Sequence, residues 1–285
     1  MANLKEIRNR IASVSSTMQI TSAMKMVSAA KLKKAQDAIT AMRPYSDTLT
    51  DLLQSLSSNI ESSDASKYAL VRPEVKILLV AITSNRGLCG AFNTNIIKRT
   101  QQLANVTYVN ASVSVMAIGK KAADILGKTL PIVANESAVY EDLNYVNVSE
   151  IAERLMLDFS DGTYDKIILV YNKFKNAATQ EVMTEQFLPI VPVVGGSQEA
   201  DYIFEPSKEE IVSELVPKAL KTQLFKGIRD SFASEHGARM TAMHKATDNA
   251  TEMRDQLKLT YNKARQASIT NEILEIVGGA EALKE

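Results

Sequence analysis

The chain contains no tryptophan and only one cysteine, and these shortages limit which disulfides and which ligand pockets the protein can form. A single cysteine, Cys89, excludes an intrachain disulfide and fits a reducing compartment. Aromatic residues make up only 6% of the 285 residues, whereas methionine occurs 11 times, which suits helical interfaces better than aromatic-lined ligand pockets. No apolar run approaches the ~18 residues of a membrane span, and the N-terminus lacks a signal-peptide core. We therefore expect neither a membrane span nor export by a standard signal.

Charge of one sign does not dominate, because basic and acidic residues number 33 each, so we expect no nucleic-acid partner. The N-terminal part departs from this balance: residues 1–43 hold eight basic and two acidic residues, a net charge of +6. A solvated helix face would explain this run. A surface for an acidic partner would also explain it, since a basic helix attracts such a partner over about 10 Å in salt. Composition alone leaves both interpretations open.

Residues 1–57 are predicted to form one long helix, because apolar side chains recur at steps of three and four. Pro44 is expected to kink or restart this helix, since it lacks an N–H donor and clashes with the preceding turn. The predicted apolar seam consists of Leu4, Ile7, Ile11, Val14, Met18, Met24, Val27, Ala35, Ile39 and Met42, continued by Tyr45, Leu49, Leu52, Leu53 and Leu56.

Residues 74–195 alternate short β-rich runs with helical patterns. This alternation predicts βαβ units and a Rossmann-like, mostly parallel sheet with helices on its faces. The predicted strands are Val75–Ile82, Val113–Ile118, Leu130–Val133, Lys166–Val170 and Glu181–Leu188, and the predicted helices are Phe92–Leu103, Lys120–Leu126 and Val148–Phe159.

The segment Ser84–Asn93 follows the first predicted strand, where a doubly wound sheet would hold a phosphate. It contains Arg86, Gly87 and Gly90, but it matches neither the GxGxxG nor the GxxxxGK[ST] pattern. A tight strand-to-helix turn is the favoured interpretation. Because the two histidines, His236 and His244, lie far away in the C-terminal helix, we expect no Cys–His nucleophile, no metal site and no cofactor.

Residues 207–285 are predicted to form a second long helix. Ser207 and Glu210 make a capping box at its start, while Pro217 and Gly237 are expected to kink or weaken it. Its last part steps by three and four, as a coiled-coil seam does. The predicted seam consists of Ala250, Met253, Leu257, Thr260, Ala264, Ala267, Asn271 and Leu274.

A helix of this length would measure on the order of 115 Å, whereas a domain of about 120 residues is only some 28 Å across. The economical partner of each terminal helix is therefore the other one. We predict an α/β fold in which an antiparallel two-helix coiled coil (1–57 and 207–285) carries an inserted α/β domain (74–195). Small and polar seam residues would leave the tip marginally stable in water, so neighbouring proteins would have to enclose it.

Several segments resemble the gamma subunits of ATP synthases. The segment ITNEILEIVGGAEA (Ile269–Ala282) is similar to the C-terminal signature of that family. Agreement in three separated regions is more specific than any single motif. The supporting segments are YNKARQASIT (Tyr261–Thr270), KATDNA (Lys245–Ala250), KEIRNRIASV (Lys5–Val14), SAMKMVSAAKL (Ser22–Leu32) and the loop TSNRGLCGAFN (Thr83–Asn93).

The resemblance implies a rotor without bond chemistry of its own. Such a subunit is the central stalk, a coiled coil inside a hexamer of alternating alpha and beta chains, and it also meets an epsilon subunit and a membrane ring of c subunits. By turning, it couples proton flow to ATP synthesis in the beta chains and regulates ATPase activity. Because the match starts within the first five residues, no room is left for a transit peptide, and we expect a peripheral protein on the cytoplasmic face of a bacterial plasma membrane.

The resemblance also implies three sets of contacts. Phe204 stands where some relatives are expected to have tyrosine, which puts a hydroxyl contact there in doubt. The implied positions are Met24, Lys25 and Arg239 against the acidic lever of beta; Arg265, Gln266, Ile269 and Thr270 against the open beta chain; and Tyr202, Phe204 and Glu205 against the c ring.

Two other classes of protein compete with the rotor. An α/β nucleotide-dependent enzyme with helical dimerisation arms would require a phosphate loop and an acid/base pair. A coiled-coil adaptor would require terminal helices that are stable in the free chain.

Overall fold

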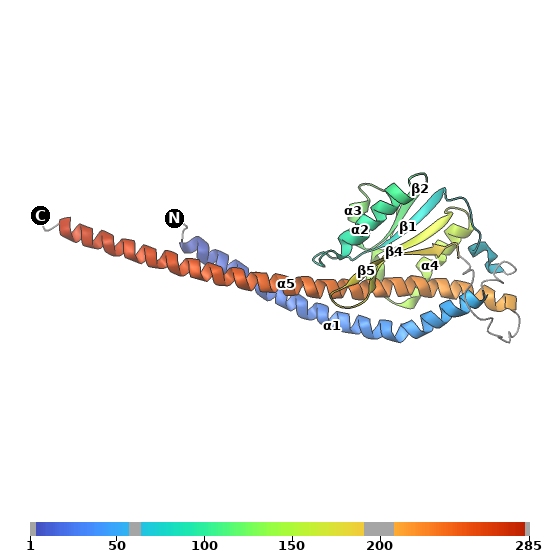
Figure 1. Cartoon of the computed structure of the whole chain (residues 1–285), viewed down its shortest axis with the longest axis horizontal. Coiled ribbons are helices and arrows are strands. Elements are labelled where there is room, and N and C mark those ends of the chain that lie inside the picture. Colours follow the sequence, from blue (N-terminus) through green and yellow to red (C-terminus); the bar gives the residue numbers. More distant parts are fainter. Residues whose placement is uncertain (1–3, 57–63, 191–207, 283–285) are drawn as a thin grey trace. The chain divides into compact units, whose positions relative to one another are not determined.

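The computed structural model describes residues 4–56, 64–190 and 208–282 (Figure 1). The chain divides into two compact units. The helical unit comprises Met1–Val27 and Met240–Glu285, and the α/β unit comprises Ser28–Arg239. Two long helices, α1 (Leu4–Leu56) and α5 (Lys208–Ala282), contribute to both units.

The α/β unit is built on a five-stranded sheet with the strand order β3-β2-β1-β4-β5. Strands β1 to β4 are parallel, and β5 runs antiparallel to β4, so the prediction of a mostly parallel sheet is confirmed. The strands are β1 (Lys76–Ile82), β2 (Ser112–Ile118), β3 (Ile132–Asn135), β4 (Lys166–Phe174) and β5 (Gln180–Leu188).

The predicted helices of this unit are all present: Lys120–Leu126 has the predicted bounds, and the ends of the other two are shifted. Helix α4 begins three residues earlier than predicted, because the side chain of Asn144 accepts a hydrogen bond from the Asn147 amide and so caps the first turn. Strand β4 extends to Phe174 because it pairs with β5 as a hairpin. The helices are α2 (Phe92–Gln102), α3 (Lys120–Leu126) and α4 (Tyr145–Ser160), with short turns η2 (Asp64–Tyr68), η3 (Leu103–Thr107) and η4 (Ser137–Tyr140).

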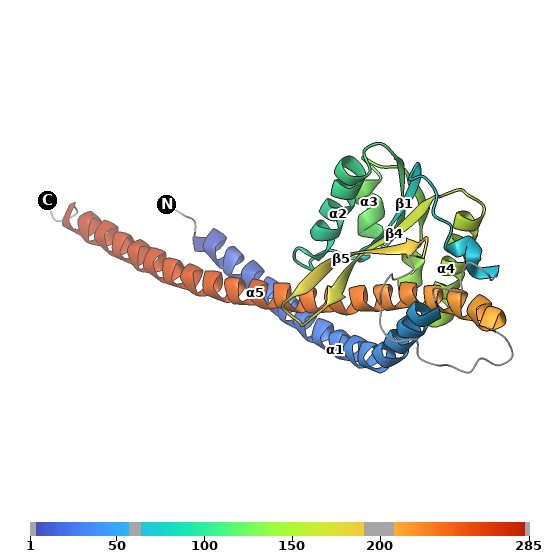
Figure 2. The same cartoon turned by 45° about the vertical axis from the view of Figure 1, so that its right-hand side comes forward.

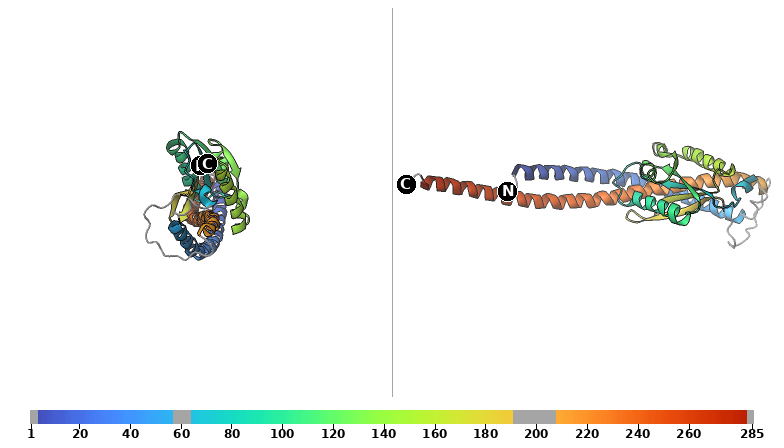
Figure 3. Two further views of the ribbon diagram at one scale, coloured as in Figure 1. Left: turned by 90° about the vertical axis from the view of Figure 1, so that its right-hand side faces the viewer. Right: turned by 90° about the horizontal axis from the view of Figure 1, so that it is seen from above.

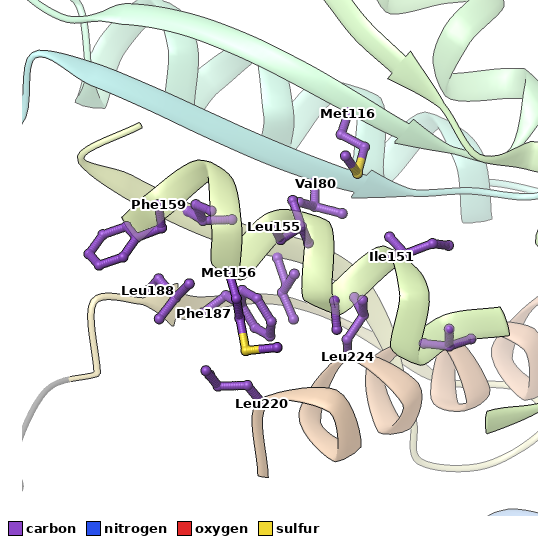
Figure 4. Packing of buried hydrophobic residues seen from close by; sticks show 14 of the residues in the cluster. Val80, Met116, Ile151, Leu155, Met156, Phe159, Phe187, Leu188, Leu220 and Leu224 are labelled. Atoms are coloured by element: carbon purple, nitrogen blue, oxygen red, sulfur yellow. The ribbon is translucent and has the colours of Figure 1, made fainter. Parts of the chain in front are cut away.

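Helices cover both faces of the sheet (Figures 1 and 2). Alternate residues of β1 point to opposite faces, so Ile77, Leu79 and Ala81 pack under α2 and α3, while Leu78 and Val80 face α4 and α5. Figure 4 shows this second layer, in which Ile151, Leu155, Met156 and Phe159 of α4 lie among Val80, Met116, Phe187 and Leu188 of the sheet and Leu220 and Leu224 of α5.

Both prolines are accommodated inside continuous helices. Helix α1 remains helical through Pro44, so the helix does not restart there. Figure 2 shows that α1 bends in its C-terminal part. Helix α5 also continues through Pro217. The predicted capping residue Ser207 lies outside the described residues.

Gly237 has a packing role that the sequence does not reveal. A Cβ atom at this position would lie 3.2 Å from the backbone oxygen of Ala177, in the turn between β4 and β5. Glycine therefore permits a close approach between α5 and this turn, which is a better account of Gly237 than a simple weak point in the helix.

The helical unit is an antiparallel pair, because residues early in α1 meet residues late in α5: Arg8 contacts Tyr261 and Thr21 contacts Thr247. The two segments run side by side in Figure 3, and α5 continues past the N-terminal end of α1. The prediction of a coiled coil formed by the chain ends is thereby confirmed.

The seam of α1 agrees with the prediction up to Met18 and again at Ala35, Ile39 and Met42, but it differs from the prediction by one residue in two places. Thr21 is buried and Lys25 half-buried at the next seam positions, whereas Val27 is 56% exposed. The same shift recurs later, where Ser46 is buried and Tyr45 exposed. The heptad of α1 continues unbroken through polar residues, so the prediction is wrong where it assigns the neighbouring apolar residue to the seam.

The seam of α5 shows a similar difference. Ala250 is buried and Leu257 and Ala264 are half-buried, as predicted. The other predicted seam residues are exposed: Met253, Thr260, Ala267, Asn271 and Leu274. In place of the first three of these, the next residue along the chain is half-buried: Arg254, Tyr261 and Ser268.

Candidate partner-binding surfaces

Polar contacts join the two helices of the helical unit. The Arg8 guanidinium donates to the Tyr261 hydroxyl at 2.7 Å, and the hydroxyls of Thr21 and Thr247 lie 2.8 Å apart. Arg254 contacts the Met18 sulfur at 3.5 Å. These contacts need specific side chains opposite one another, so they set the register, but they bury little apolar surface. The pair is thin-cored, as the sequence predicts.

Among the described residues, no other helix lies beside the C-terminal end of α5 (Figure 3). All residues from Ile269 to Ala280 are exposed. Large apolar side chains on this segment are between 48% and 71% exposed: Ile269, Ile273, Leu274, Ile276 and Val277. A helix with this many exposed apolar residues indicates an interaction surface.

The positions predicted to meet a beta chain fall on two parts of the helical unit. Met24 and Lys25 are half-buried on α1. Arg265 and Gln266 are exposed on α5, next to the exposed apolar end that begins with Ile269 and Thr270. The charged and amide groups of Arg265 and Gln266 point to solvent and have no side-chain partner within the described ranges. The predicted ring contacts Tyr202, Phe204 and Glu205 lie outside the described residues.

Arg239 has a different environment from the one predicted. It lies in the α/β unit and is only 8% exposed. Its guanidinium pairs with Glu235 one turn earlier on α5 and donates to the backbone oxygens of Arg86 and Gly87 at 3.0 and 3.3 Å. Internal acceptors occupy this fork, and the predicted contact between Arg239 and a beta chain stays a prediction.

Glu235 is as buried as Arg239, at 8% exposed. Burial raises the pKa of its carboxyl, while the positive charge of Arg239 acts in the opposite direction. The helical spacing of four residues between Glu235 and Arg239 is visible in the sequence and could have suggested their pairing. Nothing in the sequence reveals that the pair is buried.

The loop Ser84–Asn93 forms the tight turn that the sequence predicts. The Asn93 side chain accepts a hydrogen bond from the Ser84 amide at 3.0 Å, and Leu88 and Gly90 adopt left-handed backbone conformations, with φ of 60° and 59°. Cys89 is buried in this turn, and its burial raises the pKa of the thiol. A buried thiol with a raised pKa is a poor nucleophile.

The N-terminus of α3, which contacts this loop, has its first amides hydrogen-bonded within the chain. At the start of α3, the Lys120 amide donates to the Asn85 side chain at 3.0 Å and the Ala122 amide to the Thr83 hydroxyl at 2.9 Å. The Lys121 amide donates to the Ser84 oxygen. These bonds tie the start of α3 to the loop that follows β1.

The described residues contain neither a candidate metal site nor a candidate membrane span. Among residues 4–56, 64–190 and 208–282, no three histidine, cysteine, aspartate or glutamate side chains form a group that could hold a metal ion. No helix in these ranges combines the length and the apolarity of a membrane span.

Comparisons with known proteins give one consistent result. A family model described as ATP synthase matches residues 3–283. The chain is 68% identical to the ATP synthase gamma chain of Flavobacterium psychrophilum over the full length of both, 65% identical to that of Christiangramia forsetii over 99% of both, and 43% identical to that of Geotalea daltonii over both full lengths.

Solved structures agree with these relatives. The fold matches a chain of the Euglena gracilis mitochondrial ATP synthase with a TM-score of 0.71 and 23% identity, covering 98% of this chain and 94% of that one. It also matches a chain from the central stalk and c-ring of the Tetrahymena thermophila mitochondrial ATP synthase, with a TM-score of 0.60, 26% identity and coverage of 80% and 99%. From the sequence matches over its whole length, together with the shared coiled coil and α/β unit, we conclude that the chain belongs to the family of ATP synthase gamma chains.

Proposed function

We propose that this chain is the central-stalk rotor of a proton-transporting ATP synthase and couples rotation to ATP synthesis and hydrolysis in the beta subunits. The observation that carries the proposal is the exposed apolar end of α5, Ile269 to Ala280, beyond the thin-cored helix pair. Such a segment needs other proteins around it. The full-length match to gamma chains supports the proposal that these proteins are the alpha and beta chains of a hexamer.

The mechanism rests on contacts that differ as the rotor turns. A partner's equilibrium shifts only when a contact stabilises one of its conformations more than another. Lys25 on α1 would attract an acidic lever of beta, and the fork of Arg265 with Gln266 would bind a loop of an open beta chain, with Ile269 and Thr270 beside it. The contact of Arg239 with the same lever is a further part of the proposal, alongside the bonds that its guanidinium makes within the chain.

Further parts of the proposal concern the remaining partners. We propose that Tyr202, Phe204 and Glu205 meet the ring of c subunits, that an epsilon subunit binds the chain, and that the chain regulates ATPase activity. We further propose that residues 74–195 act as a domain inserted between the helices 1–57 and 207–285. The chain would have no active site or cofactor and would reach the cytoplasmic face of a bacterial plasma membrane only through that ring.

Charge reversal tests the rotor contacts. Lys25→Glu or Arg265→Glu in the assembled enzyme should reduce ATP-driven proton pumping per ATP hydrolysed by about tenfold or more, since reversing the charge at a contact costs at least about 1.4 kcal/mol, which corresponds to a factor of ten. Pumping is measured in membrane vesicles with a pH-sensitive dye, alongside the rate of ATP hydrolysis.

Lys98→Glu is the matched control, because Lys98 is an exposed lysine on α2 of the α/β unit. This variant should pump normally. Normal coupling in both Lys25→Glu and Arg265→Glu would refute the proposed contacts, and failure of the unmodified chain to assemble with alpha and beta subunits would refute the rotor itself.

A further inference from the structure

Within the α/β unit, two helical turns of α5 are surrounded on all sides by other residues. Every residue from Ala233 to Arg239 is buried. A helix that is buried all round lies in a core rather than on a surface. Small side chains permit this enclosure: Gly237 allows the turn at Ala177 to approach, and Ala238 packs against Cys89 and Phe92 of the loop after β1.

Directional bonds hold this part of α5 to the carboxyl ends of two central strands. Ser234 donates from its hydroxyl to the Asn172 oxygen of β4 at 3.0 Å. Arg239 donates to the oxygens of Arg86 and Gly87, in the loop that follows β1. Apolar contacts have no preferred direction, whereas a hydrogen bond weakens steeply when its angle changes. These bonds therefore resist rotation of α5 about its own axis.

The loop that receives Arg239 is itself tied to the sheet. The Asn172 side chain of β4 donates to the Phe92 oxygen at 3.2 Å, and the hydroxyl of Ser84, at the start of the loop, donates to the Arg86 oxygen at 2.7 Å. Arg239 thus connects α5 to a loop that has a second attachment to β4. The three form a closed set of bonds at one end of the sheet.

Stability alone does not explain a buried ion pair here. Apolar side chains of similar volume can replace such a pair with little loss or even a gain of stability. The guanidinium instead has a geometric advantage, since its planar fork reaches Glu235 and both loop oxygens at once, which a lysine ammonium would not do in the same orientation.

We propose that Arg239, oriented by Glu235, is a positioning residue that locks α5 to the loop Arg86–Gly87, so that helix and sheet turn as one body when torque passes along α5. This inference rests on the proposed rotor function. Arg239 is the last residue of the α/β unit, and α5 continues without interruption into the helical unit, so the lock is placed at the end of the enclosed segment.

The test separates the lock from stability. Arg239→Met leaves Glu235 buried without its partner and should destabilise the α/β unit. The double variant Glu235→Leu/Arg239→Met removes both charges, so the amides of β1 and β4 should exchange hydrogen as slowly as in the unmodified chain. Arg239→Lys, a second variant, keeps a charge beside Glu235 without the fork.

In the double variant and in Arg239→Lys, the amides of the loop 86–91 should exchange about tenfold faster. In the assembled enzyme, both variants should show lower torsional stiffness in single-molecule rotation and several-fold less proton pumping per ATP hydrolysed. Lys221→Met/Glu153→Leu removes a more exposed ion pair of α5 and should change none of these quantities.

The outcomes distinguish this inference from the rotor function. Unchanged loop exchange in both variants would overturn the assignment of Arg239, and so would a loosened loop with normal stiffness and normal pumping. In either case an unmodified enzyme that pumps protons would leave the rotor function standing, because only the lock would have failed.

Discussion

His236 is a buried imidazole in an apolar environment on α5. It is 5% exposed, and neither ring nitrogen has a hydrogen-bond partner among the described residues. The ring of Phe232 packs against it edge-on, with centroids 4.5 Å apart. Burial, together with the positive charges of Arg239 and Lys31, lowers the pKa of His236 to about 3. The imidazole is therefore neutral at physiological pH.

This histidine should make the α/β unit sensitive to acid. The unfolded chain binds a proton near pH 6.5 and the folded chain only near pH 3, so the free energy of unfolding falls as pH drops below about 6.5, by up to about 1.4 kcal/mol per pH unit. His236→Leu should remove this dependence and cost little at pH 7, because an unpaired buried polar group is replaced by an apolar one. Urea unfolding at pH 7 and pH 5 measures both effects.

Comparison with the unmodified chain isolates His236 from neighbouring acids. Burial raises the pKa values of Glu235 and Asp230, and a raised acid pKa makes the folded state more stable as pH falls, which is the opposite sign. His244→Gln, at the other histidine, which is exposed, is the control and should leave the slope unchanged. Equal pH slopes for His236→Leu and the unmodified chain would contradict the prediction.

Two glycines in α5 share a helical conformation but differ in their surroundings. A Cβ atom on Gly227 would meet the Tyr171 ring at 3.6 Å, an ordinary contact distance, whereas one on Gly237 would meet the Ala177 backbone at 3.2 and 3.3 Å. Glycine inside a helix is about 0.5–1 kcal/mol less favourable than alanine. The same substitution should therefore have different consequences at the two positions.

Gly227→Ala should raise the free energy of unfolding by about 0.5–1 kcal/mol, since the new methyl group fits. Gly237→Ala should gain nothing or lose stability, because the turn at Ala177 must move to make room. Denaturant unfolding of the two variants gives the comparison directly. A gain at Gly237 equal to that at Gly227 would show that the turn yields freely and that the close approach is unimportant.

The two long helices show why their existence could be predicted but their register could not. Leu4, Ile7 and Ile11 define a seam that any partner would use. Further along, the seam passes through Thr21 on α1 and Tyr261 on α5, which the apolar pattern of one helix does not favour. Thr21 and Tyr261 occupy seam positions because each bonds to a residue of the other helix, Thr21 to Thr247 and Tyr261 to Arg8.

In the free chain, the two ends of α5 should differ in stability. Amides of α5 from about 212 to 239 lie in the core of the α/β unit, whereas those from 269 to 282 belong to a single exposed helix, and isolated helices of that length are marginal in water. Hydrogen exchange of the purified chain should therefore be fast in 269–282 and slow in 212–239.

Assembly with the catalytic hexamer should slow exchange in residues 269–282 and leave residues 212–239 nearly unchanged. The free and assembled forms thus serve as each other's control. Slow exchange of 269–282 in the free chain would mean that the segment is stable without neighbours, which favours a coiled-coil adaptor over the rotor.

Most of the features that could be predicted from the sequence depend on residues close to one another in the chain. Strand and helix positions in the α/β unit follow from apolar periodicity, the tight turn at Ser84–Asn93 from its glycines and polar residues, and the pairing of the chain ends from two seams of matching period. The contacts of Arg239, the need for glycine at 237 and the polar seam partners depend on residues far apart in the chain. Long-range packing brings them together, and no local pattern encodes which acceptor a buried side chain will meet.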